Sequence, residues 1–517
     1  MKNSIKTSRI NHTVFWPPFL VLLASVIFSF INGDGFAVAM NGAYEWITNW
    51  FDWLFALVAL GFVILCIVIF CSPAGRIKFG GEDAKPKYTF IQWFAMSLCG
   101  GIAIGIVFWG VAEPIQHLEE PALGITPESA EAVMFSISTV FHHWSFTPYA
   151  LYVTATIPIA LAVYNYHQKM TISSGLYFLL GDRCHGKIGT IVDAVCLFSL
   201  AGGIATSMGM GIMQIASGLD FVAGIDPSPF IWAIVALGIV ISFTASSAVG
   251  MDKGLKWLSD QNLKLYILIL LFIIVVGPTA YIFKIGVEGM GEFVTTFFSK
   301  STYLGVATGE DWSRWWSIFY WASWIAYAPV VGVFLTRLCY GRTIRQFLAV
   351  NLVAPALFGI VWFTVFGGTS IHMQLDGSFD LWSALETNGL ESAVFAFFDQ
   401  FPFGTFVVIL FLVIIVISFV TMADSMTSVA AIMSTSGFQQ GEGEPPLFLK
   451  VTWGLIMGSL AWVMISFAGI DGTKMLAVLA SFPLLFLMIA LAFSAMRGLY
   501  AQQTDFASIG RKKDKNA

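Results

Sequence analysis

An aromatic run at residues 320–332, YWASWIAYAPVVG, carries side chains that could bind a cation. Tyr320, Trp324 and Tyr327 are spaced i, i+4 and i+7, so they share one face of a helix. The faces of tryptophan and tyrosine rings attract cations, and they do so most strongly where water is excluded. Both flanks of the run are apolar, so the sequence predicts a cation site buried within a membrane.

The same run contains Pro329 and Gly332, which are typical of interrupted helices. Proline removes a backbone donor, so we expect the helix to break near Pro329. A second interruption is predicted at 100–105 (GGIAIG), and a polar patch at 421–425 (TMADS) lies within another apolar stretch. In lipid, a broken helix is tolerated only where it lines a cavity or packs on protein. Because glycine in a membrane helix usually serves close packing, the location of these breaks decides between packing and a site.

A second aromatic group lies at 143–152, HWSFTPYALY. On a straight helix Trp144 and Tyr149 do not share a face, whereas a distortion at Pro148 would bring them together. Alone, this group is typical of packing or of an interfacial belt. Together with the run at 320–332, it predicts an aromatic box that also includes Tyr152.

These side chains must be positioned by membrane-spanning helices. Of the 517 residues, 57% are hydrophobic and 11% are charged, whereas soluble domains carry about 25% charged residues. A span needs about 20 mostly apolar residues. Twelve stretches meet that need: 14–31, 51–71, 90–117, 131–165, 188–222, 229–250, 256–284, 312–339, 343–370, 402–433, 446–469 and 473–496.

The interrupted spans occupy matching places in two halves of the chain. Setting the first two spans aside leaves two sets of five spans. The first span of one set is 90–117, and the first span of the other is 312–339. Interrupted helices at corresponding places in two halves point to the binding site of a transporter.

Charged residues alternate between the loops. Lys and Arg gather before the first span, after the second, fourth, sixth and eighth spans, and at the end of the chain. Because basic loops stay in the cytoplasm, both ends are predicted to be cytoplasmic. Two connections, 286–300 and 391–400, mix acids with phenylalanine and predict amphipathic helices that lie on the protein or at headgroup level.

Five motifs extend this interpretation: WGVAEP (109–114), HWSFTPYALY (143–152), FYWASWIAYAP (319–329), GRTIRQF (341–347) and FVTMADS (419–425). Through them the sequence resembles the betaine/carnitine/choline transporters from about residue 14 to 497. The resemblance implies an all-α integral membrane protein with about twelve spans in a leucine-transporter-like fold. Spans 3–7 and 8–12 would form two inverted five-helix repeats, with two extra N-terminal helices. It also implies a homotrimer, and we expect it in the cytoplasmic (inner) membrane.

The expected organisation has five parts. These are the N-terminal tail with two peripheral helices (1–80), the first repeat (81–285), an extracellular or periplasmic amphipathic helix (286–311), the second repeat (312–500) and a short cytoplasmic tail (501–517).

Carried over by position, the resemblance implies which residues bind substrate. The trimethylammonium box falls on Trp144, Tyr149, Tyr152 and Trp324, with Tyr327 one turn further on and Trp321 in the same run. Unwound helix backbone is implied at Gly101, Ile102, Ala103 and Gly105. Many relatives have two adjacent tryptophans where this sequence has Ser323-Trp324, and many have tryptophan in place of Tyr149. Tyrosine still offers a ring face, although a weaker one.

The run Gly105-Ile106-Val107 bears on the substrate, because choline-carrying relatives place an aspartate there. Without that acid a quaternary cation would lack a counter-ion, whereas a zwitterion would not need one. We therefore expect a zwitterionic trimethylammonium compound such as glycine betaine or carnitine, with choline as the alternative.

The coupling ion is predicted from a few positions. Those that match the sodium ligands of relatives are Cys99, Ile102, Ser418, Thr421 and Met422. Sodium-coupled relatives use a pair of hydroxyls, of which Thr421 keeps one and Met422 replaces the other. A thioether is a poor ligand for a hard cation. Sodium-independent exchangers place Arg and Met where this sequence has Asn262 and Val331. We expect sodium-coupled symport, with betaine/betaine antiport of the carnitine/butyrobetaine type as the alternative.

Other classes of protein lack support. The sequence has no glycine-rich phosphate loop and no HExxH motif, so we expect neither a pump nor an enzyme. We expect no cofactor beyond a sodium ion and no nucleic-acid partner. Ionisable residues within spans are candidates for function. For Glu113 and Asp424 we expect pairing with backbone donors at helix breaks, and for His142 and His143 a structural role ahead of proton relay.

Overall fold

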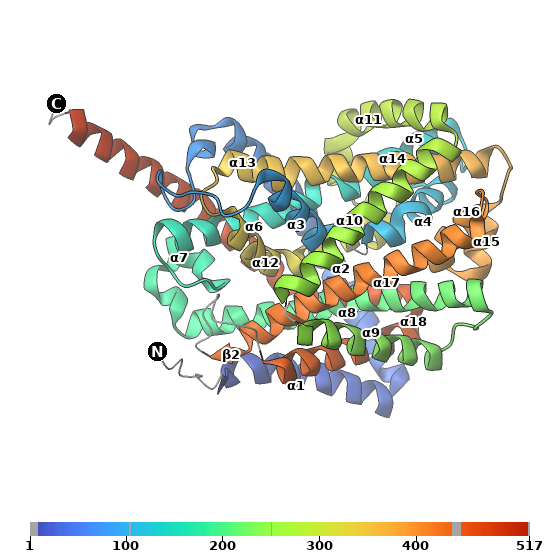
Figure 1. Ribbon diagram of the computed structural model, residues 1–517, viewed down its shortest axis with the longest axis horizontal. Helices are drawn as coiled ribbons and strands as arrows, with labels where there is room; N and C mark the ends of the chain where they lie inside the picture. Colours follow the sequence, from blue (N-terminus) through green and yellow to red (C-terminus); the bar gives the residue numbers. More distant parts are fainter. Residues whose placement is uncertain (1–8, 103–104, 250, 437–445, 515–517) are drawn as a thin grey trace.

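The computed structural model describes residues 9–102, 105–249, 251–436 and 446–514. Its described part is helical except for loops and one short antiparallel pair, β1 (Arg9–Ile10) with β2 (Thr435–Ser436). Figure 1 shows the helices packed into one body, with the end of the last helix projecting from it. The predicted all-α architecture is confirmed.

The longer elements follow in chain order. They are α1 (His12–Ile31), α2 (Gly33–Cys71), α3 (Phe90–Ile102), α4 (Gly105–Glu119), α5 (Ala130–Trp144), α6 (Phe146–Asn165), α8 (Lys187–Ala223), α9 (Pro229–Val249), α10 (Met251–Val276), α11 (Thr279–Thr302), α12 (Phe319–Cys339), α14 (Ala354–Leu375), α15 (Leu381–Asn388), α16 (Ala393–Asp399), α17 (Gly404–Met433) and α18 (Leu447–Asp514). Short helices α7 (Tyr177–Leu180) and α13 (Ile344–Leu348) and two π-helical turns, η4 (Arg314–Ile318) and η5 (Ala349–Val353), lie between them.

Many of these helices are long and apolar enough to cross a membrane. Among the described residues, eight helical stretches meet that standard, or nine if the bent pair α10 and α11 counts as one span. α18 covers the last two predicted spans. Its backbone leaves the helical region at Ala468 and Gly469, and this kink lies where the first of the two spans is predicted to end. Each of the twelve predicted spans falls on one helix or on two or three consecutive helical elements.

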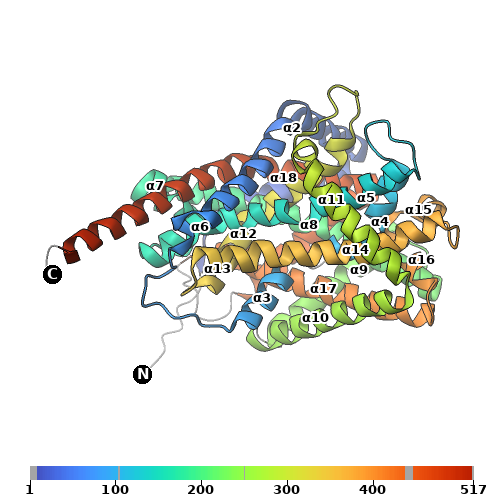
Figure 2. The same cartoon turned by 90° about the horizontal axis from the view of Figure 1, so that it is seen from above.

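The two predicted surface helices are present. α11 turns away from α10 by 110° and packs against α5 and α14, as Figure 2 shows. α16 covers most of the second segment, and its Phe395, Phe397 and Phe398 are fully buried. Both helices therefore lie on their own protein, which is one of the two arrangements expected.

The predicted break at Pro329 is wrong. α12 continues through Pro329 to Cys339, and the irregular turn, η4, precedes it. Proline removes one backbone donor, and neighbouring helices compensate for this loss in membrane proteins. Gly332 brings α12 close to α6, because a Cβ there would lie 3.3 Å from the carbonyl carbon of Ala155. This glycine serves helix packing.

The predicted interruption at 100–105 is only partly covered by the described residues. α3 extends to Ile102 and α4 starts at Gly105, and Ala103 lies outside the described residues. Gly101 and Ile102, which we expected to be unwound, belong to the last turn of α3, and Gly105 is the first residue of α4. The unwound backbone therefore stays a prediction.

The alternation of charges predicts that the loop at 372–390 faces the outside of the cell and that the loop around Arg183 faces the cytoplasm. We expect Ser378→Cys to react with an impermeant maleimide in intact cells, because Ser378 is exposed. Arg183→Cys, also exposed, should react only after permeabilisation. Both variants need a Cys71→Ser background, since Cys71 is an exposed free thiol. Labelling of the two sites from the same side would contradict the topology.

Candidate functional site

Four predicted box residues meet around Trp324, and we call them the Trp324 cluster: Trp144, Tyr149, Tyr152 and Trp324. The centroid of the Trp324 ring lies 5.9 Å from that of Trp144, 5.5 Å from that of Tyr149 and 5.0 Å from that of Tyr152. All four side chains are buried. At these distances the rings touch one another.

A break between α5 and α6 brings the cluster together. Trp144 is the last residue of α5, Ser145 has φ −117° and ψ −116°, and α6 begins at Phe146. The predicted distortion is thus present, but it lies three residues before Pro148. Pro148 occupies the first turn of α6, where a missing N–H has no helical partner to lose.

Two glycines hold Trp144 in place. A Cβ at Gly105, the first residue of α4, would overlap the Trp144 ring. A Cβ at Gly359 of α14 would overlap the Trp144 backbone carbonyl. At these close approaches no larger residue fits without movement. Gly105 therefore makes room for a ring of the cluster.

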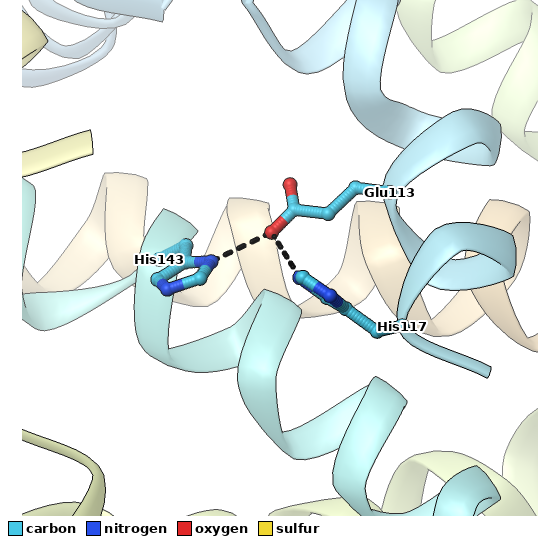
Figure 3. Close-up of side chains that lie close together, drawn as sticks. All are labelled: Glu113, His117 and His143. Carbon is cyan, nitrogen blue, oxygen red and sulfur yellow. Dashed lines mark hydrogen bonds and ion pairs between the residues drawn. The ribbon is translucent and has the colours of Figure 1, made fainter. Parts of the chain in front are cut away.

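The carboxylate of Glu113 contacts the cluster through the indole nitrogen of Trp144. Its Oε1 lies 2.7 Å from His143 Nδ1 and 3.2 Å from His117 Nε2 (Figure 3). Its Oε2 accepts hydrogen bonds from Trp144 Nε1, at 2.7 Å, and from the Tyr320 hydroxyl. We expected backbone donors here, but the partners are four side chains. Glu113 is fully buried, and four partners satisfy a charge that would otherwise be costly to bury.

The hydrogen-bond network continues beyond the carboxylate. His143 Nε2 lies 2.9 Å from the Ser317 hydroxyl, so both its ring nitrogens have partners. The ligand atoms of Glu113, His117 and His143 lie within 4.8 Å of one another, a grouping that could hold a metal ion. Their mutual hydrogen bonds already explain this grouping. His143 therefore has the structural role that the sequence analysis placed first.

Two further predicted residues lie beside the cluster. Tyr327 donates to the Gly203 carbonyl at 2.6 Å, and its hydroxyl lies 2.8 Å from that of Ser207, so it is fixed to α8. Trp321 packs against His142 and His143, at centroid distances of 5.2 and 5.8 Å. The structure groups Trp321 with the histidines rather than with the Trp324 cluster.

A second aromatic group already holds a cation of the protein. The Lys474 ammonium lies 4.3 Å from the ring centroid of Trp316 and 5.7 Å from those of Trp109 and Phe319. The sequence analysis missed this group, because its lysine comes from α18. Within the described residues, no lysine or arginine lies over a ring of the Trp324 cluster.

A small cavity adjoins Tyr149 and Tyr152. It has about 10 Å³ of internal space, and Ser97, Val331 and Asn351 also line it. Three buried polar atoms at this cavity have no hydrogen-bond partner among the described residues: Ser97 Oγ, Tyr149 Oη and Asn351 Oδ1. Unpaired buried polar atoms are rare in proteins, so this side of the cluster is suited to a polar group of a ligand.

The predicted sodium ligands lie on two helices, α3 and α17. The Ser418 hydroxyl lies 3.1 Å from Asn262 Oδ1 and 2.8 Å from the Tyr266 hydroxyl, both on α10. Thr421 donates to the Ile417 carbonyl at 2.7 Å, which leaves its oxygen able to accept or to coordinate. Cys99 and Ile102 belong to α3, but their side chains lie outside the described residues.

The other intramembrane carboxylate also differs from expectation. Asp424 of α17 pairs with Lys450 of α18 at 2.7 Å, and both side chains are buried. The prediction of a backbone partner did not include this lysine, which lies 26 positions further along the chain.

The network around Glu113 predicts the effect of replacing that carboxylate. We expect Glu113→Gln to lower stability by about 2 kcal/mol or more, because an amide nitrogen would face donors that now find an acceptor. The measurement is the midpoint of thermal unfolding in detergent. The control is Glu386→Gln, since Glu386 is exposed and should tolerate the change. Equal midpoints for the two variants would show that the network contributes no stability.

Comparisons with known proteins identify the family. The model of the betaine/carnitine/choline family transporters (BCCT) matches residues 13–504. The glycine betaine transporter OpuD of Bacillus subtilis is 35% identical over 490 residues, 94% of this chain and 94% of that protein. A probable glycine betaine transporter of Desulfitobacterium hafniense is 32% identical, over 95% of this chain and 97% of that protein. An ectoine/hydroxyectoine transporter of Virgibacillus pantothenticus is 30% identical, with the same coverage.

These matches span nearly the whole chain, including every motif on which the resemblance was based. They also agree with the long apolar helices and with a buried site between them. The predicted family is confirmed, and with it the prediction that the protein is not an enzyme. The chain belongs to the betaine/carnitine/choline transporter family and is a multi-pass membrane transporter.

Proposed function

We propose that this protein is a sodium-coupled symporter of a zwitterionic trimethylammonium compound such as glycine betaine or carnitine. The Trp324 cluster would bind the cationic end of the substrate. One observation carries the proposal: four buried rings gather around Trp324 and no basic side chain among the described residues lies over them. The other aromatic group is already occupied by Lys474. Cation–π attraction of about 2 kcal/mol or more per desolvated ring suits a group that has no N–H to donate.

The polar atoms around the cluster favour a zwitterion. The oxygens of Glu113 are used by four side-chain partners, so this carboxylate would act on the cation through the Trp144 ring rather than by contact. On the other side, the hydroxyls of Ser97 and Tyr149 have no partner in the part of the chain that the structure describes, and they can donate to a carboxylate. Two relatives named for glycine betaine support the same substrate class.

The sodium ion would be held by Thr421 together with carbonyls of the last turn of α3. Ser418 already contacts Asn262 and Tyr266, so Thr421 is the hydroxyl that we assign to the ion. Met422 would contribute little to a hard cation. We further propose a homotrimer in the cytoplasmic membrane with both chain ends in the cytoplasm.

Trp324 is expected to provide the main ring of the cation site. Trp324→Leu keeps apolar bulk and removes the π face, so betaine affinity should fall at least about tenfold, which corresponds to 1.4 kcal/mol. Equilibrium binding of radiolabelled glycine betaine to purified protein measures this change.

Trp50→Leu is the matched control, because Trp50 is 67% exposed on α2. It should bind betaine as the wild type does. A loss of affinity in both variants, or in neither, would place the binding site elsewhere. Competition by carnitine, ectoine and choline in the same assay identifies the preferred compound.

Sodium dependence is expected to act through Thr421. Thr421→Val keeps the shape and removes the oxygen, so the sodium concentration for half-maximal uptake into liposomes should rise by about tenfold if that oxygen contributes about 1.4 kcal/mol. Met422→Ser adds a hydroxyl and should lower the requirement.

Thr427→Val serves as the control. Thr427 lies on the same helix and donates to the carbonyl four residues before it, at 2.6 Å, as Thr421 does. Its replacement should leave the sodium requirement unchanged. Uptake that ignores sodium but needs betaine inside the liposomes would instead establish the antiporter.

A further inference from the structure

A cavity separate from the Trp324 cluster lies between α5, α11 and η4. It has a volume of about 150 Å³. Its walls combine aromatic rings with basic and hydroxyl side chains, among them Phe135, Thr139, His142, Lys300, Tyr303 and Trp312. The residues that line it include no aspartate and no glutamate. A cavity with basic walls and no acid disfavours a cationic ligand.

Lys300 brings an ammonium group to this cavity from α11. Its Nζ donates to the Phe135 carbonyl at 3.0 Å and to the Thr139 hydroxyl, and it lies 4.3 Å from the Phe135 ring centroid. An ammonium has three donors, so one is left. Within the described residues Lys300 forms no ion pair. A charge that is partly removed from water without a counter-ion favours the binding of an anion.

His142 provides a second, independent sign of a ligand. Its side chain is 1% exposed, and neither ring nitrogen has a hydrogen-bond partner among the described residues. The ring is held between Phe297 and Trp321, at centroid distances of 5.3 and 5.2 Å, and it lines the cavity. An unpaired buried donor is unfavourable, and a ligand at the cavity would remove that cost.

We propose that this cavity binds a small monovalent anion, held by the Lys300 ammonium and an N–H of His142. The anion could be a halide or the carboxylate of a small organic solute, since both accept hydrogen bonds from these donors and fit the volume. Neighbouring hydroxyls are less available, because Tyr303 donates to Glu310 at 2.7 Å and Ser299 donates to the Thr296 carbonyl at 2.9 Å.

The position of the cavity relates it to the transport site. His143 and its partner Ser317 both line the cavity, and the other ring nitrogen of His143 contacts Glu113. Glu113 in turn accepts a hydrogen bond from Trp144 of the Trp324 cluster. The bound anion would thus lie beside a network that fixes one ring of the proposed substrate site.

The line width of the ³⁵Cl NMR signal tests the proposal with the full-length protein in detergent and chloride as the probe. We expect the wild type to broaden the signal and added acetate to reverse the broadening. If the protein broadens the ³⁵Cl signal and acetate reverses the broadening, halides and carboxylates share the site. If only ¹³C-acetate is broadened, the site is selective for carboxylates.

Variants separate this site from other basic groups. Lys300→Met should bind the anion at least tenfold more weakly, Lys300→Arg should retain binding, and His142→Phe should weaken it several-fold while keeping the aromatic packing. Lys284→Met is the control, because Lys284 is exposed on the same helix. Unchanged thermal unfolding of each variant establishes that it is folded. Equal broadening by the wild type and Lys300→Met, or no broadening of either anion, would overturn the proposal.

Discussion

The burial of one carboxylate constrains the centre of this structure. Moving a carboxylate out of water costs several kcal/mol even after the protein relaxes, so Glu113 needs partners that reach both oxygens. They come from three helices: His117 from α4 itself, His143 and Trp144 from α5, and Tyr320 from α12. Satisfying the charge therefore fixes how these helices meet. It also orients the Trp144 indole, whose N–H points to the carboxylate while its ring contacts Trp324.

The two aromatic groups differ in whether a cation of the protein lies against them. The Lys474 ammonium lies against the rings of Trp109, Trp316 and Phe319, which shows that this fold can surround a cation with its own side chains. The rings contact one another in both groups, but around Trp324 no lysine or arginine of the described residues lies against them. A cation must lie against ring faces to be attracted, so the spacing of the four rings determines how well the proposed substrate would bind. Three of these rings come from α6 and α12, so a movement of one helix relative to the other would change that spacing.

How far the sequence predicts such a site depends on whether the determining contacts are local. Trp324 and its partners could be predicted, because helical spacing and short motifs place the rings. The position of the α5–α6 break could not be predicted. The break at Ser145 lies next to the close contact between the Trp144 carbonyl and Gly359, which is more than 200 positions away in the sequence. For the same reason the partners of Glu113 were missed, since Tyr320 lies 207 positions from it. The break predicted at Pro329 is absent because the loss of one backbone donor is outweighed by the packing of α12 against α6.

The contacts of Asn262 explain why the coupling ion is hard to read from this chain. Exchangers that do not need sodium are expected to carry arginine at this position. In this chain Asn262 Oδ1 lies 3.1 Å from the Ser418 hydroxyl of α17. A fixed guanidinium at that place would supply a positive charge beside the polar segment of α17. Asparagine supplies none, so α10 and α17 meet through neutral hydrogen bonds that join Ser418 of α17 to Asn262 and Tyr266 of α10. The sodium ion that we propose near Thr421 would bring a positive charge to this polar segment, with the Thr421 hydroxyl as one of its ligands.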